Sequence, residues 1–422
     1  MKIITTSDWH LGNLFHGNDR LPEHRHFLHW LEEQIVAQRP DALLVAGDIF
    51  DNGNPSAAAQ EAYYDFLARV TEACPEMHVV ITAGNHDSAN RLEAPRPLLS
   101  RHKVEIRGKV RRNYVVNDDG GQWEIDYEDM MIPLTGQDGR EIVVLAVPYL
   151  RTDVLPVGSY SQGVNALLRE LTNRARVKFP NRTLVMMAHM YAKGADIAPK
   201  DASEKIVIGG QEEVNMENWP EHPDYLTCGH IHKRQHIWNT NWARYTGSVL
   251  PMSFVEKDYR HGVDLVTIDD AGRFAVEQLV YEPQHKLMIL PEEDEELTLS
   301  KLKKLINASL GERVEDKLND DYVYLALKVK IERMRSDDIR ELEELIAKKN
   351  AVLCKIQKIM SQVDITTVTG KEKLTSIDDV VNRDPMETLK EAFFVINKTE
   401  MNEQQTKMLQ EIVDSIKNEE ND

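Results

Sequence analysis

The stretch ITAGNHDSANRL, residues 81–92, decides how the fold is interpreted. An apolar run ends at Ile81, and four residues of different chemistry follow almost at once: Gly84, Asn85, His86 and Asp87. Amide, imidazole and carboxylate groups are costly to bury without partners, and they are common in metal sites and in acid–base catalysis. One such ending is compatible with an ordinary loop, so the question is whether the chain repeats it.

Four more apolar runs end in residues of the same kinds. The runs are 2–8, 41–48, 182–190 and 224–232, and they end at Asp8 and His10, at Asp48, at His189, and at His230 and His232. Segments of helical periodicity, 23–38 and 56–73, separate the first three runs, and Ser56 is the expected N-cap of the second segment. Alternating strands and helices predict βαβ units and a largely parallel, buried sheet.

The carboxyl ends of parallel strands lie along one edge of a sheet, where ligands bind. Five runs therefore deliver carboxylate, amide and imidazole groups to one rim, enough for two metal ions that share a bridging ligand. Oxygen and nitrogen donors without thiolate favour Mn, Fe or Zn over Ca or Mg. Glycines before Asp48, Asn85 and His230 are expected to allow sharp turns and a close approach of the backbone to an ion.

Other polar clusters have a structural interpretation. His24, His26 and His29 fall on the amphipathic helix 23–38, where a solvated face is favoured over a metal-binding tract. Cys228 is expected to pack as a small apolar residue. The acidic run at 292–296 is expected to be a solvated segment.

The composition bounds the class of protein. With 422 residues, 41% hydrophobic and 29% charged, the chain is typical of a soluble globular protein of two or three domains. We find no apolar stretch near the ~18 residues of a membrane span and no secretory signal in MKIITTSDWH, and three widely spaced cysteines fit a reducing cytoplasm. The net charge of −19 argues against nucleic-acid binding through a broad basic surface, but not against an enzyme whose bound cations supply the positive charge.

Four segments are predicted along the chain. Residues 1–282 carry all the strand endings described above. Residues 283–363 are predicted to form a small α+β domain, with helices at 300–309 and 336–350, the latter capped by Ser336, and strands at 322–332 and 351–359. Residues 364–383 are predicted to be a linker, and residues 384–422 a pair of helices that begins at Asp384-Pro385.

The combination of motifs resembles the calcineurin-like metallophosphoesterases. The motifs are DxH at 8–10, GDxxD at 47–51, GNHD at 84–87, the single His189 and GHxH at 229–232. The stretches SDWHLG (7–12), VAGDIFDNGNP (45–55), GNHDSANRL (84–92), DYLTCGHIHKRQ (224–235) and YTGSVLPMSF (245–254) are closest to members that serve as nuclease subunits of bacterial DNA repair complexes. The resemblance implies an α/β sandwich of mixed sheets flanked by helices, with a small α+β capping domain and a C-terminal helical tail.

The resemblance also implies roles for the residues at the strand ends. Asp8, His10 and His232 would hold one ion, Asn85, His189 and His230 would hold the other, and Asp48 would bridge them. His86 would protonate the leaving oxygen or stabilise the phosphate. Asp51 is a second candidate catalytic residue, at a position where archaeal and eukaryotic relatives carry a histidine. Members of this group cut double-stranded DNA ends and hairpins as Mn2+-dependent exonucleases and endonucleases.

The same group implies partners. Its members work as homodimers with an SMC-like ATPase, whose coiled-coil base binds the C-terminal helices. The candidates for that contact are Leu389, Phe393 and Phe394, although these helices are also able to pack on their own domain. Arg91, Arg96, Lys233 and Arg234 are candidate DNA contacts, although basic side chains beside such motifs face solvent about as often.

Two other functions share the same sequence features. A stand-alone hydrolase of cyclic nucleotides or small phosphodiesters would use the same metal core, but it has no evident need for a cap and a helical tail. A non-enzymatic scaffold would tolerate a degenerate site, and the complete set of candidate ligands weighs against it.

Overall fold

The computed structural model describes residues 1–117, 120–155, 158–196, 213–215, 219, 221–238, 240–293, 297–315, 317–329, 335–358 and 406. Met1–Lys328 and Arg335–Gln357 form one compact unit. No helix in the described part of the chain is both long and apolar enough to cross a membrane. The predicted linker at 364–383 and the helices predicted at 384–422 lie outside the described residues, apart from residue 406.

The first of two six-stranded sheets has the strand order β16-β15-β1-β4-β5-β6. The four strands from β1 to β6 in this order are parallel, and the β15–β16 hairpin adds two antiparallel strands at one edge. The strands are β1 (Lys2–Thr6), β4 (Ala42–Ala46), β5 (His78–Thr82), β6 (Val104–Arg107), β15 (Gly262–Ile268) and β16 (Phe274–Val280).

The second sheet has the strand order β13-β14-β12-β11-β10-β9. Its four central strands are parallel, and β13 and β9 are antiparallel edge strands. The strands are β9 (Met131–Thr135), β10 (Glu141–Ala146), β11 (Thr183–His189), β12 (Tyr225–Gly229), β13 (Gln235–His236) and β14 (Ala243–Tyr245).

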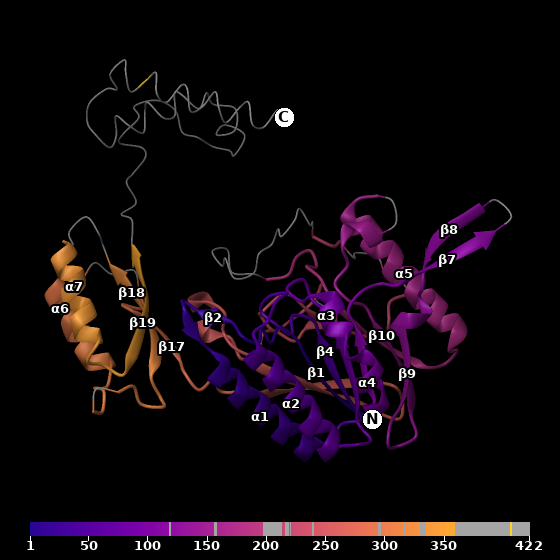
Figure 1. Ribbon diagram of the computed structural model, residues 1–422, viewed down its shortest axis with the longest axis horizontal. Coiled ribbons are helices and arrows are strands. Elements are labelled where there is room, and N and C mark those ends of the chain that lie inside the picture. The colour runs from indigo at the N-terminus through magenta and orange to yellow at the C-terminus, as the bar shows by residue number, and fades with distance from the viewer. Residues whose placement is uncertain are drawn as a thin grey trace. The chain divides into compact units, whose positions relative to one another are not determined.

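The two sheets pack face to face through a common apolar core. Ile3 and Leu44 of the first sheet belong to the same buried cluster as Val144 and Val185 of the second. Two adjacent helices, α1 (Leu21–Gln38) and α2 (Ala57–Ala73), cover the outer face of the first sheet, and α5 (Tyr160–Lys178) covers that of the second (Figure 1). The predicted sandwich is thus confirmed. The parallel βαβ sheet expected for the first three runs is also confirmed by β1, β4 and β5. The expectation that all five runs share one sheet was wrong, because periodicity identifies strands but not which strands pair.

The start of α2 follows local rules and the start of α1 does not. The side chain of Ser56 accepts a hydrogen bond from the backbone N–H of Ala59, as predicted for an N-cap.

His26 and His29 on α1 are exposed, as expected, but His24 is fully buried. The prediction of a solvated His24 was wrong because the first turn of α1 is covered by tertiary contacts around the buried Arg20–Glu23 ion pair. Burial and the neighbouring Arg20 lower the pKa of His24 to about 3.

Shorter elements connect the larger ones. A two-stranded ribbon follows β1, another hairpin follows β6, and two short helices follow β5. They are β2 (Leu14–Phe15), β3 (Asn18–Asp19), β7 (Arg112–Asn117), β8 (Gly120–Ile125), α3 (Ala89–Glu93) and α4 (Arg96–Leu99).

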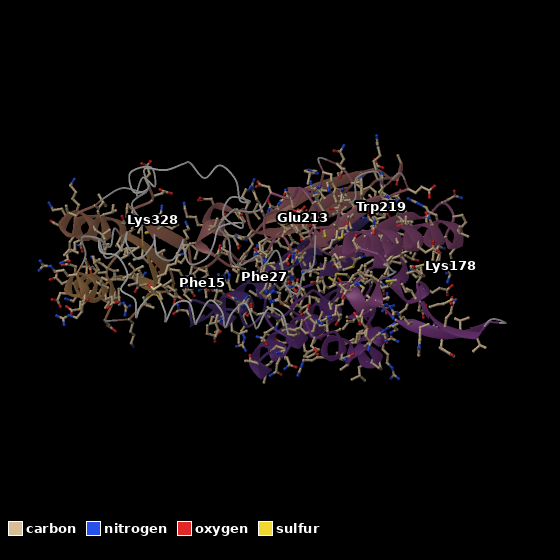
Figure 2. All side chains as sticks on the ribbon, turned by 90° about the horizontal axis from the view of Figure 1, so that it is seen from above. Phe15, Phe27, Lys178, Glu213, Trp219 and Lys328 are labelled. Atoms are coloured by element: carbon tan, nitrogen blue, oxygen red, sulfur yellow. The ribbon has the colours of Figure 1, made fainter. Side chains whose placement is uncertain are left out.

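A third sheet, β17-β18-β19, lies in the predicted α+β segment. Its elements are β17 (Leu287–Leu290), β18 (Val323–Val329), β19 (Ala351–Lys358), α6 (Leu299–Ser309) and α7 (Ser336–Ile346). Phe15, labelled in Figure 2, contacts Tyr324 of β18 at a ring-centroid distance of 5.1 Å. This segment therefore packs on the sandwich within the same compact unit, and its predicted boundary at residue 282 stays a prediction.

Helix α7 begins one residue earlier than a Ser336 N-cap would give. Ser336 is the first helical residue, and the N-cap is Arg335. The Asp338 carboxylate accepts a hydrogen bond from the Arg335 backbone N–H at 2.8 Å, so the acidic side chain one turn on fixes this start. The predicted N-cap role of Ser336 was wrong.

Candidate metal centre

The carboxyl ends of strands from both sheets meet at one place. The backbone N–H of Asp8, after β1, donates to the carbonyl oxygen of Gly47 at 3.1 Å, and that of His10 donates to Asp48 at 3.0 Å. From the second sheet, the backbone N–H of His230 donates to Oδ1 of Asp8 at 3.0 Å. The rim expected on one sheet is therefore formed by two sheets, and the sandwich brings their ends together.

The backbone at these strand ends is left-handed at four residues that are not glycine. The φ angles are 52° at Asp8, 47° at His10, 51° at Asp48 and 100° at His230. Each such conformation costs free energy, and it persists only where the surrounding structure enforces it. Four of them at one rim indicate that the strand ends are shaped to aim these side chains at a common point.

Glycines make this convergence possible mainly by leaving space. A Cβ atom on Gly84 would lie 2.1 Å from Oδ1 of Asp48, and one on Gly229 would lie 2.2 Å from the carbonyl oxygen of Ala46. Only Gly47 of the three predicted glycines has a left-handed φ, at 84°. The expected sharp turn therefore holds for Gly47, whereas Gly84 and Gly229 are needed for close packing.

Asp48 lies at the middle of the cluster. Its Oδ2 is 3.3 Å from Nε2 of His189 and 3.7 Å from Nε2 of His10, and its Oδ1 accepts a hydrogen bond from the backbone N–H of His86 at 2.9 Å. Burial alone would raise the pKa of Asp48, but the charge and hydrogen bond of His189 hold it well below its usual range. Asp48 is thus a buried, ionised carboxylate with imidazoles on two sides.

His189, Asn85 and His230 form one side of the cluster. Oδ1 of Asn85 lies 2.9 Å from Nε2 of His189 and 3.1 Å from Nδ1 of His230. Burial lowers the pKa of His189, but the charge of Asp48 outweighs it and raises the pKa to about 9. Burial and the charge of His189 lower the pKa of His230 to about 3. Without metal, the surroundings thus favour the charged form of His189 and the neutral form of His230.

Asp8, His10 and His232 form the other side. Their candidate donor atoms lie within 4.8 Å of one another, as do those of Asp8, Asp48 and His189 and those of His10, Asp48 and His86. Nε2 of His10 is buried and has no hydrogen-bond partner among the residues that the structure describes. A buried donor set of carboxylates and imidazoles with such an unsatisfied nitrogen fits divalent cations.

His86 and Asp51 lie on the open side. Nδ1 of His86 lies 2.7 Å from the backbone carbonyl oxygen of Asp51, which leaves its Nε2 for other partners. The Asp51 carboxylate accepts a hydrogen bond from Nδ2 of Asn13 at 2.8 Å and lies 3.5 Å from Nδ1 of His10. Asp51 therefore contacts the back of two imidazoles of the cluster.

Sequence reasoning missed Asp87 and Glu256. The buried Asp87 carboxylate accepts hydrogen bonds from the backbone N–H groups of Ile49, Phe50 and Gly84, and it ties together the loops after β4 and β5. Its place in GNHD was a signal for this role. Glu256, fully buried, lies 3.1 Å from Nδ1 of His232, and nothing in its own local sequence marks it.

The basic candidates next to the motifs have protein partners. Arg91 donates to Asn54, Arg96 pairs with Asp129 and Lys233 pairs with Asp196. Arg234 donates through Nε to the fully buried Asp264 at 2.7 Å, which gives Arg234 a structural contact. Leu389, Phe393 and Phe394 lie outside the described residues. Cys228 is buried, as predicted.

The comparisons with known proteins agree with this geometry. Residues 1–234 match the model of the calcineurin-like phosphoesterases. SbcD of the nuclease SbcCD from Rhodobacter capsulatus is 34% identical, with 78% of this chain and 80% of that protein covered. The Escherichia coli K12 protein of the same name is 31% identical (66% and 68% covered), and that of Bacillus subtilis is 29% identical (63% and 66% covered). The chain therefore belongs to the calcineurin-like phosphoesterases and, within them, to the SbcD family.

Proposed function

We propose that this chain is a metal-dependent DNA nuclease that hydrolyses phosphodiester bonds as the SbcD component of an SbcCD-type complex. The relatives that match most of the chain carry that name. The observation that carries the proposal is Asp48, a buried carboxylate 3.3 Å from His189 and 3.7 Å from His10, which belong to opposite sides of the cluster. A carboxylate between two donor sets is what a two-metal phosphoesterase needs.

The proposed ligand sets follow the two sides of the cluster. Asp8, His10 and His232 hold one cation, Asn85, His189 and His230 hold the other, and Asp48 bridges them. The unsatisfied Nε2 of His10 and the close group of Asp8, His10 and His232 support the first set. Oδ1 of Asn85, which lies 2.9 Å from His189 and 3.1 Å from His230, supports the second. The oxygen and nitrogen donors without thiolate are compatible with Mn, Fe or Zn, and we propose Mn2+ among these because the family resemblance implies it.

The cations would supply Lewis-acid activation of the phosphodiester and a nucleophile derived from water. The chain's own residues would then orient the catalytic side chains and transfer protons. The hydrogen bond from His86 Nδ1–H to the carbonyl of Asp51 fixes the ring and leaves Nε2 to give a proton to the leaving oxygen. Asp51 acts as a positioning residue for His10 and His86 in this proposal, because its carboxylate and carbonyl contact their Nδ1 atoms.

We also propose which residues contact DNA and which partners the chain binds. Lys233 and Arg91 are the better candidates for phosphate contacts, since their partners Asp196 and Asn54 are exposed. Arg234 instead pairs with the fully buried Asp264. Leu389, Phe393 and Phe394 are proposed to bind the other component of an SbcCD-type complex, which the family resemblance implies is an SMC-like ATPase. We further propose a homodimer in the cytoplasm.

Cleavage of linear double-stranded DNA with Mn2+ tests the proposal. Wild type, Asp48→Asn and His86→Ala are compared, alone and with the ATPase partner, and Asp65→Asn and His29→Ala serve as controls because both residues are exposed on the helices. We expect cleavage by wild type and both controls and none by the two site variants. Intact DNA together with hydrolysis of a small phosphodiester would instead support the stand-alone hydrolase.

A further inference from the structure

The ring of His232 is fixed from behind by a buried carboxylate. Nδ1 of His232 lies 3.1 Å from Oε1 of Glu256, and the side chains are 5% and 0% exposed. An imidazole that donates Nδ1–H to a carboxylate has its lone pair on Nε2. Nε2 is therefore the atom that His232 offers to the group it forms with Asp8 and His10.

Glu256 is itself held in place. Its Oε2 accepts a hydrogen bond from the backbone N–H of Met252 at 2.9 Å. It lies in the 3-10 helix Phe254–Asp258, and the ring of Phe254 packs on Phe15 at a centroid distance of 5.3 Å. Buried Arg20 donates to the carbonyl oxygen of Pro251 just before this helix. These contacts leave the carboxylate little freedom to follow a displaced imidazole.

The two sides of the metal cluster differ in this respect. On the first side, His232 faces Glu256, and Nδ1 of His10 lies 3.5 Å from Oδ1 of Asp51. On the second side, Nδ1 of His189 lies 3.0 Å from the backbone carbonyl oxygen of Ala46, a neutral acceptor. Both imidazoles proposed to bind the first ion thus have a carboxylate near Nδ1. His189, proposed to bind the second ion, has a backbone carbonyl there instead.

We propose that Glu256 is a positioning residue that orients His232, and that with Asp51 it makes the ion of Asp8, His10 and His232 the more tightly bound of the two. This inference rests on the ligand sets proposed above. A carboxylate that accepts Nδ1–H makes the imidazole a better donor and locks its orientation, and loss of such a partner typically costs about 10–100-fold in metal affinity. A neutral carbonyl orients the ring without adding negative charge.

Titration of the metal-free full chain with Mn2+, followed by the electron paramagnetic resonance signal of free Mn2+, tests the inference. Wild type should show two sites of unequal affinity. Glu256→Gln keeps the shape and removes the charge, so it should weaken the tighter site by about 10–100-fold and leave the weaker one unchanged. Asp258→Asn is the matched control, since Asp258 lies in the same 3-10 helix but is 79% exposed, and it should bind as wild type does.

His232→Ala separates failure of this inference from failure of the proposed function. If His232→Ala weakens the tighter site and Glu256→Gln does not, Glu256 has no positioning role, although the ligand assignment stands. If His232→Ala binds Mn2+ as wild type does, the proposed ligand set itself is wrong.

A second measurement needs no variant at Glu256 and so does not depend on its folding. Long-range 1H–15N correlation of the metal-free wild type at pH 8 reports the tautomer of His232, with the signal assigned by its loss in His232→Ala. The inference requires the proton on Nδ1. A proton on Nε2 would overturn it.

Discussion

Nδ1 of His189 lies 3.0 Å from the carbonyl oxygen of Ala46, and its Nε2 lies 3.3 Å from Oδ2 of Asp48. The imidazole at the end of β11, in the second sheet, thus contacts the end of β4 and the following Asp48, in the first sheet. A side chain held at both nitrogens cannot turn away, so the distance between the two strand ends is set by the fold. The effects expected for Asp48→Asn and for the pH dependence of metal binding depend on this link.

Asp48→Asn should abolish Mn2+-dependent cleavage and reduce the number of bound metal ions. The amide keeps the shape of the carboxylate but removes the buried negative charge that faces His10 and His189. Metal content of the purified variant by mass spectrometry checks this. Two tightly bound ions in the variant would contradict the bridging role.

His86→Gln should lower kcat by about 10²–10⁴-fold while metal binding is retained, because the proposed role of His86 is proton transfer. Single-turnover cleavage together with Mn2+ titration measures both effects. A large loss of metal with little change in rate would make His86 a ligand instead.

Gly84→Ala should destabilise the fold by about 1–3 kcal/mol or more and weaken metal binding. The new Cβ would meet Oδ1 of Asp48 at 2.1 Å, so the central carboxylate has to move. Gly311→Ala is the control, because nothing described lies within 4 Å of a Cβ there. Urea denaturation of both variants compares them, and equal midpoints would refute the packing argument.

Metal binding should release protons below about pH 9, because the pKa of His189 in the metal-free chain is raised to about 9. This raised pKa contributes stability to the metal-free fold that is fully present below the unfolded value near 6.5 and is lost as the pH rises through 9. Calorimetry of Mn2+ binding in two buffers of different ionisation enthalpy counts the protons. We expect release at pH 7 and almost none from this group at pH 10.

Tyr324→Phe should cost about 1.5–3 kcal/mol, because its hydroxyl donates at 2.9 Å to the buried, charged Glu23. Tyr114→Phe is the control, since the Tyr114 side chain is 58% exposed. Thermal unfolding of the two variants provides the comparison. Equal melting temperatures would show that this contact between β18 and α1 adds nothing to stability.

The sequence predicted the strand ends well, because each candidate ligand follows a continuous apolar run and periodicity finds such runs. Asp8, Asp48, Asn85, His189 and His230 all reach one place in the structure. Hydrophobic periodicity could not predict that these residues lie on two sheets, since pairing between strands depends on contacts between residues far apart in the chain. The motif resemblance supplied that part of the fold.

The residues behind the ligands were harder to predict from sequence. Glu256 is 24 residues from His232 along the chain and stands in FVEKD, where nothing in the local sequence marks a buried carboxylate. His24 was assigned to a solvated face because its helix alone was considered, and contacts from outside that helix bury it. In both cases tertiary packing overrides the local pattern.

The rate of cleavage of linear duplex DNA during stepwise addition of Mn2+ to the metal-free chain tests the central claim most directly. The two-metal account predicts little cleavage with one equivalent and a steep rise as the second ion binds, with Asp48→Asn inactive throughout. Full activity with a single bound ion, or cleavage by Asp48→Asn at the wild-type rate, would contradict it.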